Sequence, residues 1–256
     1  MKSGFMKHVG NLISESDLVI EVVDARHPEY TRNKDLEKSV RKMRKKLLIV
    51  INKADLIPKE EAERKKKEMC TDSRVKTVFI SALEHDGINL IRKEIANESK
   101  GKEEFTVGVM GYPNVGKSTL INALAGKGRG RVATSRKAGL TRGLQRLKIT
   151  DGMYLLDSPG IIPFGEDEYE LFLVESKNPN QLKDVEGAAV KLVAHLGIEK
   201  IAKGYQIPLE QLQGKDEDEI LEEIAKKKHY LASGGKGDMA RACREILEKY
   251  QRHELL

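Results

Sequence analysis

The stretch from Phe105 to Ala125, FTVGVMGYPNVGKSTLINALA, decides the fold of this chain. It begins as a short apolar run typical of a buried parallel strand and ends with the spacing of a helix. Between the two lies the pattern GxxxxGKS, from Gly111 to Ser118. In this context the glycines let backbone N–H groups surround phosphates at a helix N-terminus. We therefore predict a phosphate-binding loop, with Lys117 on the terminal phosphates and Ser118 on Mg²⁺.

The other motifs of a guanine-nucleotide site are present in an unusual order. NKxD at 52–55 and SAL at 81–83 precede the phosphate loop, whereas Thr141 and DSPG at 157–160 follow it. An unpermuted GTPase runs phosphate loop, switch threonine, DxxG, NKxD and SAK. The order therefore predicts a circular permutation joined through the short polar segment 98–103, because domain termini often lie close together.

The base-binding residues are expected in the first half of the chain. Asp55 can accept a pair of hydrogen bonds that guanine donates and adenine cannot, which predicts selection of GTP over ATP. Lys53 can lay its alkyl stem along the base, and the backbone N–H of Ala82 can meet the guanine carbonyl. The residues expected to bind GTP or GDP are Asn52, Lys53, Asp55, Ser81, Ala82, Leu83, Asn114, Val115, Gly116, Lys117, Ser118, Thr119, Asp157 and Gly160.

Metal binding and catalysis are expected from the later motifs. Asp157 should reach Mg²⁺ through water, and Thr141 is the candidate for the threonine that binds Mg²⁺ together with Ser118. Lys117, Thr141 and Gly160, whose N–H should contact the γ-phosphate, are the expected catalytic groups. Ile161 stands where Ras-like enzymes carry a water-orienting glutamine. Either hydrolysis is absent, or another group or a bound cation positions the water.

Alternation of apolar runs with helical spacing predicts an α/β doubly wound sheet of the P-loop GTPase type over residues 1–162. After Gly160 only helical spacing recurs, which predicts a small all-helical domain over 163–256 that contacts RNA or the ribosome. Asp216 and Asp238 stand where helix N-caps are expected. The predicted strands are 17–24, 47–51, 76–81, 105–110 and 153–157, with 145–149 as an antiparallel edge strand. The predicted helices of the sheet domain are 34–44, 59–69, 88–98 and 117–125.

The net charge of +6 is spread unevenly. Between Lys127 and Lys148 there are eight basic residues and no acidic one, whereas a solvated face usually mixes the signs. We predict RNA contact there, with a merely cationic loop as the alternative. The basic run 64–67 is interleaved with glutamates and is expected to be an exposed helix face.

The composition also bounds the setting. No run of about 18 apolar residues is present, so no membrane partner is expected. Cys70 and Cys243 lack the spacing of a redox or metal motif, which favours a reducing compartment, the cytoplasm. We expect a monomer.

The motifs and their order resemble the circularly permuted GTPases of the YlqF/YawG type, the RbgA-like proteins of ribosome assembly. Asp24-Ala25-Arg26-x-Pro28 matches the DARxP motif of that family, and 231–242 is similar to its helical tail, which contacts ribosomal RNA. His8 does not lie in the PGHM motif of RbgA-like members. The start of the chain is closer to the archaeal and eukaryotic branch.

The resemblance implies hydrolysis of GTP to GDP and phosphate despite a hydrophobic residue after DxxG, as Ile161 is here. Asn114 matches an asparagine that helps to hold K⁺ in related GTPases. The implied role is a switch in assembly of the large ribosomal subunit through binding of its rRNA, with slow turnover unless a ribosomal particle activates it. The alternatives are a nucleotide-dependent RNA-binding scaffold with negligible hydrolysis and a GTPase in RNA modification.

Overall fold

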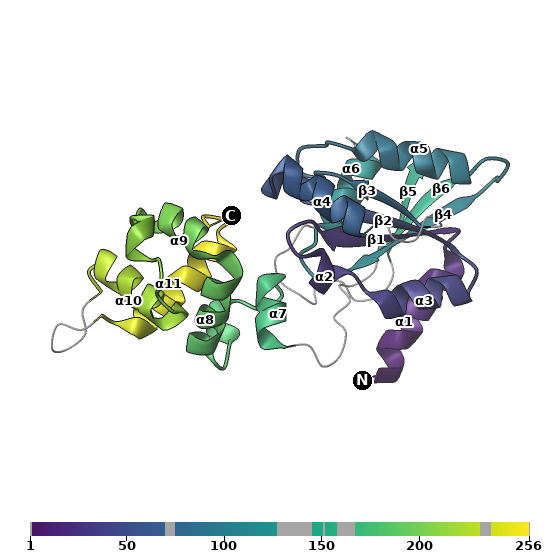
Figure 1. Cartoon of the computed structure of the whole chain (residues 1–256). Coiled ribbons are helices and arrows are strands. Elements are labelled where there is room, and N and C mark those ends of the chain that lie inside the picture. The colour runs from purple at the N-terminus through teal and green to yellow at the C-terminus, as the bar shows by residue number, and fades with distance from the viewer. Residues whose placement is uncertain are drawn as a thin grey trace. The chain divides into compact units, whose positions relative to one another are not determined.

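The computed structural model describes residues 2–69, 75–126, 145–150, 152–157, 167–230 and 237–255 (Figure 1). The chain divides into two compact units, residues 1–165 and 166–256. Each unit has its own core and is described by itself.

The first unit is built on a six-stranded sheet with the order β3-β2-β1-β4-β6-β5. All neighbouring strands are parallel except β5, which pairs antiparallel to β6 at the edge. This confirms the predicted α/β fold and the antiparallel edge strand. The strands are β1 (Leu18–Asp24), β2 (Lys46–Asn52), β3 (Lys76–Phe79), β4 (Phe105–Gly111), β5 (Gln145–Thr150) and β6 (Met153–Asp157).

Helices cover both faces of this sheet, with α1 and α3 on one face and α5 and α6 on the other (Figure 1). The predicted helices are confirmed, although α3 ends two residues early. The N-terminal helix α1 and the short α2 were not predicted. The helices of the first unit are α1 (Lys2–Glu15), α2 (Pro28–Thr31), α3 (Lys34–Lys42), α4 (Lys59–Met69), α5 (Ile88–Glu98) and α6 (Lys117–Ala125), with a 3₁₀ turn η1 (Ala54–Leu56).

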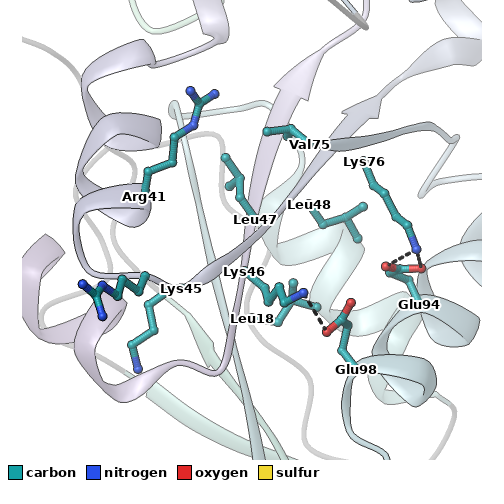
Figure 2. A pocket seen from close by; sticks show the side chains of 11 residues that line it. Leu18, Arg41, Lys45, Lys46, Leu47, Leu48, Val75, Lys76, Glu94 and Glu98 are labelled. Carbon is teal, nitrogen blue, oxygen red and sulfur yellow. Dashed lines mark hydrogen bonds and ion pairs between the residues drawn. The ribbon is translucent and has the colours of Figure 1, made fainter. Parts of the chain in front are cut away.

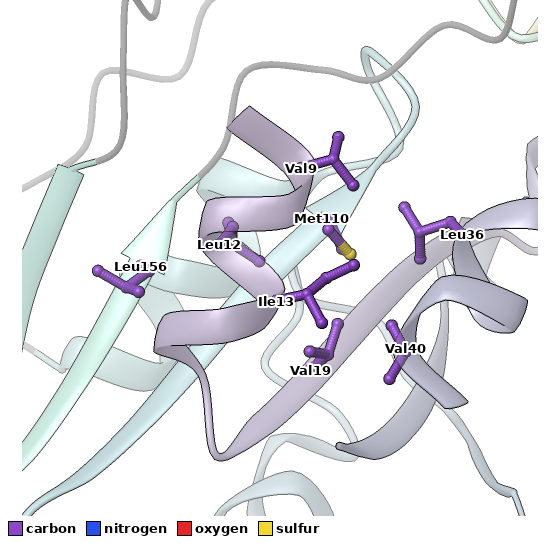
Figure 3. Close-up of a cluster of buried hydrophobic side chains, with 8 residues drawn as sticks. All are labelled: Val9, Leu12, Ile13, Val19, Leu36, Val40, Met110 and Leu156. Atoms are coloured by element: carbon purple, nitrogen blue, oxygen red, sulfur yellow. The ribbon is translucent and has the colours of Figure 1, made fainter. Parts of the chain in front are cut away.

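The helix α1 belongs to the core of the first unit. Its Leu12 and Ile13 are fully buried in a cluster with residues of β1, β4, β6 and α3 (Figure 3). Gly108 of β4 allows this approach, because a Cβ there would lie 2.6 Å from Leu12 Cδ2 and 2.2 Å from Ser16 Oγ. Packing of its apolar stripe, rather than intrinsic propensity, stabilises such a helix.

The described part of the second unit is helical, as predicted. Asp216 and Asp238 accept hydrogen bonds from backbone N–H groups in the first turns of α10 and α11, which confirms both predicted N-caps. The buried faces of α8, α10 and α11 pack against one another around Leu192, Ile224 and Ile246. The elements are α7 (Glu168–Leu173), η2 (Pro179–Gln181), α8 (Val185–Leu196), α9 (Ile198–Tyr205), η3 (Leu209–Gln211), α10 (Glu217–Lys227) and α11 (Met239–Gln251). In neither unit is a described helix long and apolar enough to cross a membrane.

Candidate nucleotide-binding site

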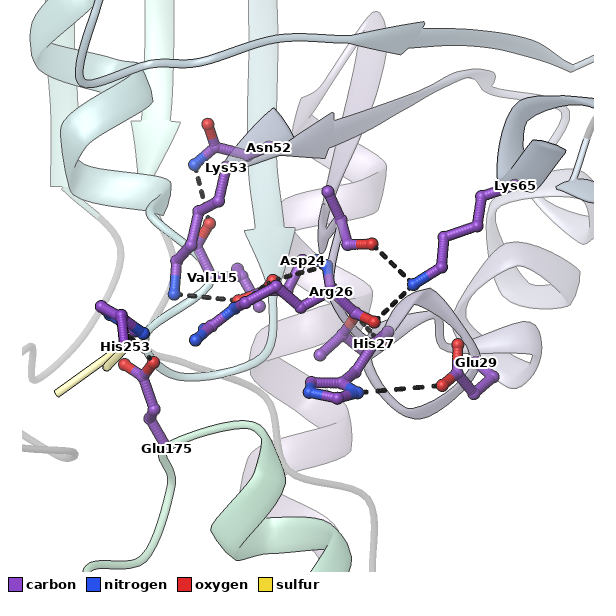
Figure 4. Close-up of polar contacts among 12 residues, drawn as sticks. Asp24, Arg26, His27, Glu29, Asn52, Lys53, Lys65, Val115, Glu175 and His253 are labelled. Atoms are coloured by element: carbon purple, nitrogen blue, oxygen red, sulfur yellow. Dashed lines mark hydrogen bonds and ion pairs between the residues drawn. The ribbon is translucent and has the colours of Figure 1, made fainter. Parts of the chain in front are cut away.

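The carboxyl ends of β1, β2 and β4 lie side by side at one edge of the sheet. The strand register pairs Asp24 of β1 with Asn52 of β2, and Val22 with Gly111 of β4. The DARxP segment therefore lies between the NKxD segment and the phosphate loop (Figure 4). Ligands of open α/β sheets bind at this edge.

A single buried side chain, Asn52, ties three of the predicted motifs together. Its Nδ2 donates to the backbone oxygen of Val115 in the phosphate loop at 2.8 Å, and its Oδ1 accepts from the N–H of Ala82 at 2.9 Å. Gly116 makes room for it: its φ is 94°, and a Cβ there would lie 2.2 Å from Asn52 Nδ2. The permuted motifs thus meet in space although 63 residues separate Asn52 from Val115.

The bond to Ala82 differs from the expectation that this N–H meets the guanine carbonyl. In the structure the N–H donates to Asn52, so a base would have to share it. Asp55 is exposed within η1, and Leu83 is 76% exposed. Ser81 is buried, and its Oγ accepts a hydrogen bond from the N–H of Glu84. The turn after β3 is thereby fixed with Leu83 on its outer side.

Beside Asn52, the carboxylate of Asp24 forms a buried charge cluster (Figure 4). Arg26 Nη2 lies 2.7 Å from Asp24 Oδ2, and Lys53 Nζ lies 2.9 Å from the same oxygen. Burial raises the pKa of the Asp24 carboxyl, but the charges of Lys53 and Arg26 outweigh burial, so the pKa lies well below its usual range. Asp24 thus fixes the end of the Lys53 side chain, whose stem is expected to lie along the base.

The basic run on α4 was predicted to be an exposed face, and for Lys65 this is wrong. Lys65 is 9% exposed, and its Nζ donates to the backbone oxygens of Ala25 at 3.1 Å and Arg26 at 2.5 Å. A long lysine side chain can bury its alkyl stem while its ammonium donates hydrogen bonds to backbone carbonyl groups that have no partner in a helix or strand. Lys65 therefore holds the DARxP segment in place, with Glu61 at 3.1 Å as its counter-ion.

The phosphate loop contains a buried lysine. Lys117 is 8% exposed, and its Nζ donates to the backbone oxygen of Tyr112 at 2.5 Å. Burial lowers the pKa of Lys117 to about 8, although the charge of Asp157 acts in the opposite direction. A polyanion beside this buried ammonium would stabilise its charged form and raise the pKa of Lys117.

The residues predicted to hold Mg²⁺ suit a hard cation in chemical terms. Ser118 is half-buried in the first turn of α6, and Asp157 is buried at the end of β6. Thr119, predicted to bind the nucleotide and not the metal, is half-buried beside Ser118. Hydroxyl and carboxylate oxygens are the donors that Mg²⁺ takes alongside phosphate and water. The charge of Asp157 also acts on Lys117, where it raises the pKa against the effect of burial.

Several predicted residues lie outside the residues that the structure describes. They are Thr141, Gly160, Ile161 and most of the basic stretch 127–148. Within that stretch Arg146 is described: it pairs with Glu104 at 3.3 Å, and its guanidinium lies 3.8 Å from the centre of the Tyr154 ring. Asn114, the residue matched to potassium binding, has a φ of 60° in the phosphate loop.

Comparisons with known proteins agree with this geometry. A family model described as RsgA GTPase matches residues 6–166, and one described as 50S ribosome-binding GTPase matches residues 106–231. A GDP-bound structure of YlqF superposes with a TM-score of 0.64 at 25% identity, covering 96% of this chain and 94% of that one. The chain belongs to the circularly permuted, YlqF-type GTPases.

Relatives of this GTPase family are found in archaea and eukaryotes. A GTP-binding protein of Methanocaldococcus jannaschii is 38% identical over 96% of this chain and 64% of its own length. The nuclear GTP-binding protein NUG1 of Saccharomyces cerevisiae is 29% identical over 100% of this chain and 56% of its own length. GNP-bound YlqF from T. maritima has the same fold, with a TM-score of 0.63 at 23% identity over 99% of this chain and 95% of that chain. The chain spans less than two thirds of the length of these curated relatives.

Sequence reasoning missed Asp24, Arg26 and Lys65 as parts of the site, although DARxP was noted as a motif. A signal for Asp24 was available, because it ends an apolar strand as Asp157 does. A polar residue at the carboxyl end of a central parallel strand points into the ligand edge of the sheet.

Proposed function

We propose that this chain binds GTP at the carboxyl edge of its sheet, hydrolyses it to GDP and phosphate, and acts as a switch in assembly of the large ribosomal subunit. The observation that carries the proposal is the Asn52 side chain, which joins NKxD, SAL and the phosphate loop. This junction supports the proposal, because it joins the segment that would bind the base to the segment that would bind the phosphates.

Specific residues would hold the two ends of the nucleotide. Asp55 and the turn around Ala82 would read the guanine, while Lys53 would cover the base with its stem. At the other end, the phosphate-loop N–H groups from Asn114 onward and the ammonium of Lys117 would bind the phosphates. Mg²⁺ would be held by Ser118, Thr141 and Asp157, and when bound its positive charge would offset the negative charge of the phosphates.

Hydrolysis without a glutamine after DxxG calls for a further group. We propose that K⁺, held with the help of Asn114, supplies positive charge beside the phosphates in a site where Lys117 already lies. Hydrolysis should then rise when Na⁺ is replaced by K⁺ at constant ionic strength. Asn114→Ala should remove that difference, whereas equal rates in both salts for the unmodified chain would exclude K⁺.

The partner we propose is the large ribosomal subunit or its rRNA. The basic stretch 127–148 includes Thr141, so RNA bound to this stretch would also act on the Mg²⁺ site. Residues 163–256 follow DxxG directly in the chain, so a movement of the DxxG loop on GTP hydrolysis would shift them. We propose that these residues also contact RNA. The family description "50S ribosome-binding GTPase" supports this partner. We propose that the chain works as a cytoplasmic monomer.

Single-turnover hydrolysis with and without purified large subunits tests the proposal. Ras alone turns over at roughly 3–5 × 10⁻⁴ per second, and we expect a comparably slow rate here, accelerated at least ten-fold by the particles. GTP-bound protein should also cosediment with them more tightly than GDP-bound protein. Neither acceleration nor nucleotide preference would contradict the ribosomal role and leave GTP binding standing.

A scaffold with negligible hydrolysis is the second candidate, favoured by Ile161 in the glutamine position. It predicts nucleotide-dependent cosedimentation with no particle-stimulated turnover. The same experiment therefore separates it from the GTPase switch. A third candidate, a GTPase in RNA modification, gains no support from a second metal centre, because no group of three or more His, Cys, Asp or Glu side chains among the described residues could hold a metal ion.

A further inference from the structure

The opposite edge of the sheet, where the strands begin, has a pocket of about 440 Å³ (Figure 2). Its apolar lining comes from Leu18, Leu47, Leu48 and Val75. Much of the remaining lining comes from RKMRKK at 41–46, the segment that runs from the end of α3 to the start of β2 and has five cationic side chains in six residues. We call this segment and its pocket the basal basic surface.

The cationic side chains of this surface outnumber the acidic side chains that pair with them. The side chain of Arg44 has no ion pair or hydrogen bond to any described residue, and Lys45 Nζ donates to a neutral backbone oxygen, that of Ser14, at 2.8 Å. Arg41 lies 3.6 Å from Glu37 while its side chain stays 47% exposed. An excess of cations over acidic side chains beside a cavity attracts a polyanion.

The acidic residues of the pocket lie on one side and are already paired. Lys76 lies 2.7 Å from Glu94, and Lys46 lies 3.9 Å from Glu98 (Figure 2). Within each pair the two charges cancel, so the α5 side of the pocket has little net charge. The α3 side, with Arg41 and Arg44, keeps its excess of positive charge.

This surface is separate from the nucleotide site. Leu18 pairs with Lys46 at the beginning of β1, whereas Asp24 pairs with Asn52 at its end. A strand of seven residues is roughly 20 Å long at about 3.3 Å per residue. A GTP molecule at the carboxyl edge cannot reach this surface, so any ligand bound here would be a separate molecule or a separate part of a larger one.

We infer that the basal basic surface is a second RNA-binding site, which takes an unpaired segment of RNA. Arg41, Arg44 and Lys45 would bind backbone phosphates, with the guanidinium groups suited to two phosphate oxygens at once. The apolar floor of the pocket would take an unstacked base. Single-stranded nucleic acids are bound by this combination of a cationic groove and an apolar platform.

The identity of the ligand as RNA rests on the proposed function, whereas the anion-binding surface itself does not. The test uses the full chain and a fluorescent 12-nucleotide oligouridine, with affinity measured from 50 to 300 mM salt. Arg41→Gln with Arg44→Gln removes two charges from the surface. Lys66→Gln with Lys67→Gln removes two charges from exposed positions of α4 and is the matched control.

The pocket variant should bind the oligonucleotide at least ten-fold more weakly at low salt. Its log–log salt slope should flatten by about 1.4, since each phosphate contact to a single strand contributes about 0.7. The control variant should keep most of the affinity, and both variants should bind GTP as the unmodified chain does. Equal binding by the two variants, whether both retain or both lose affinity, would overturn the inference.

Photo-crosslinking with 4-thiouridine in the same oligonucleotide locates the RNA. Crosslinked peptides should include residues 41–48 or 75–76, and crosslinks confined to other segments would overturn the inference. Competition by polyglutamate as strong as that by oligouridine of equal charge would also overturn it, in favour of an acidic protein partner. Failure of the proposed function would be seen separately, as absence of particle-stimulated hydrolysis in the unmodified chain.

Discussion

The two edges of the sheet carry charge in opposite ways. At the carboxyl edge the charged groups are buried or half-buried and interact with each other: Asp24 forms ion pairs with Arg26 and Lys53, and the charge of Asp157 acts on Lys117. At the amino edge the exposed Arg41 lies 3.6 Å from Glu37, and the exposed side chain of Arg44 has no ion pair with any described residue. Buried charges have fixed positions and shifted pKa values, which suits one ligand of defined shape. Exposed charges act through their number and are screened by salt, which suits a polyanion.

The largest expected effect comes from breaking the carboxyl-edge cluster. Asp24→Asn leaves the buried Arg26 and the half-buried Lys53 without their shared carboxylate and should cost about 3–5 kcal/mol of unfolding free energy. Urea unfolding measures it. The control is Asp35→Asn, which removes an exposed pair with Lys38 at 2.9 Å and should cost about 0–1 kcal/mol. Equal losses in the two variants would mean that burial does not distinguish these ion pairs.

A buried acid within the sheet should make stability depend on pH. Burial raises the pKa of Glu21 from 4.5 to about 8, with the charge of Glu37 adding to it and the N–H of Asn33 and the charge of Arg32 opposing it. Because the folded-state pKa is the higher one, the stability that Glu21 contributes is present below pH 4.5 and is lost as the pH rises through about 8. Each pKa unit corresponds to about 1.4 kcal/mol.

The variant Glu21→Gln isolates this effect. We subtract the unfolding free energy of the unmodified chain from that of the variant. This difference should increase steadily from pH 5 to pH 8, by a few kcal/mol in total, because each pKa unit corresponds to about 1.4 kcal/mol. Urea unfolding at pH 5, 6.5 and 8 measures the difference. A difference that stays flat across these values would show that Glu21 ionises as readily in the fold as in the unfolded chain.

A smaller effect should accompany nucleotide binding. The pKa of Lys117 is about 8 in the structure, and phosphates beside the ammonium should raise it. At pH 9 GTP binding should therefore take up a proton at Lys117, up to about one per site. Titration calorimetry in two buffers of different ionisation enthalpy detects the uptake. Binding enthalpies that agree between the buffers would place the phosphates away from Lys117.

The sequence was sufficient to predict the fold of the first unit because its strands are apolar runs with motifs at their ends. The antiparallel β5 and the helix bounds of α4, α5 and α6 also followed from local pattern. The helix α1 did not follow, because Gly4 and Gly10 interrupt its pattern and its stability comes from packing Leu12 and Ile13 on the sheet.

The polar part of the site was less predictable than its motifs. Lys65 sits among glutamates and has the local pattern of a surface residue, yet it caps carbonyls 39 and 40 residues earlier in the chain. The Asp24–Lys53 ion pair likewise depends on strand register. Pattern within one segment cannot reveal contacts that the topology creates between segments.

The most direct test of the central claim, that the carboxyl edge binds a guanine nucleotide, is the base specificity of Asp55→Asn. The exposed Asp55 carboxylate would accept two hydrogen bonds from guanine, and an amide reverses the polarity of one of them. If the bound base buries and pairs this carboxylate, equilibrium titration should show GTP weakened by about 2–5 kcal/mol and xanthosine triphosphate strengthened, with ATP bound poorly by both proteins. Unmodified protein that bound ATP as tightly as GTP, or a variant whose preference for GTP over xanthosine triphosphate did not change, would contradict the account.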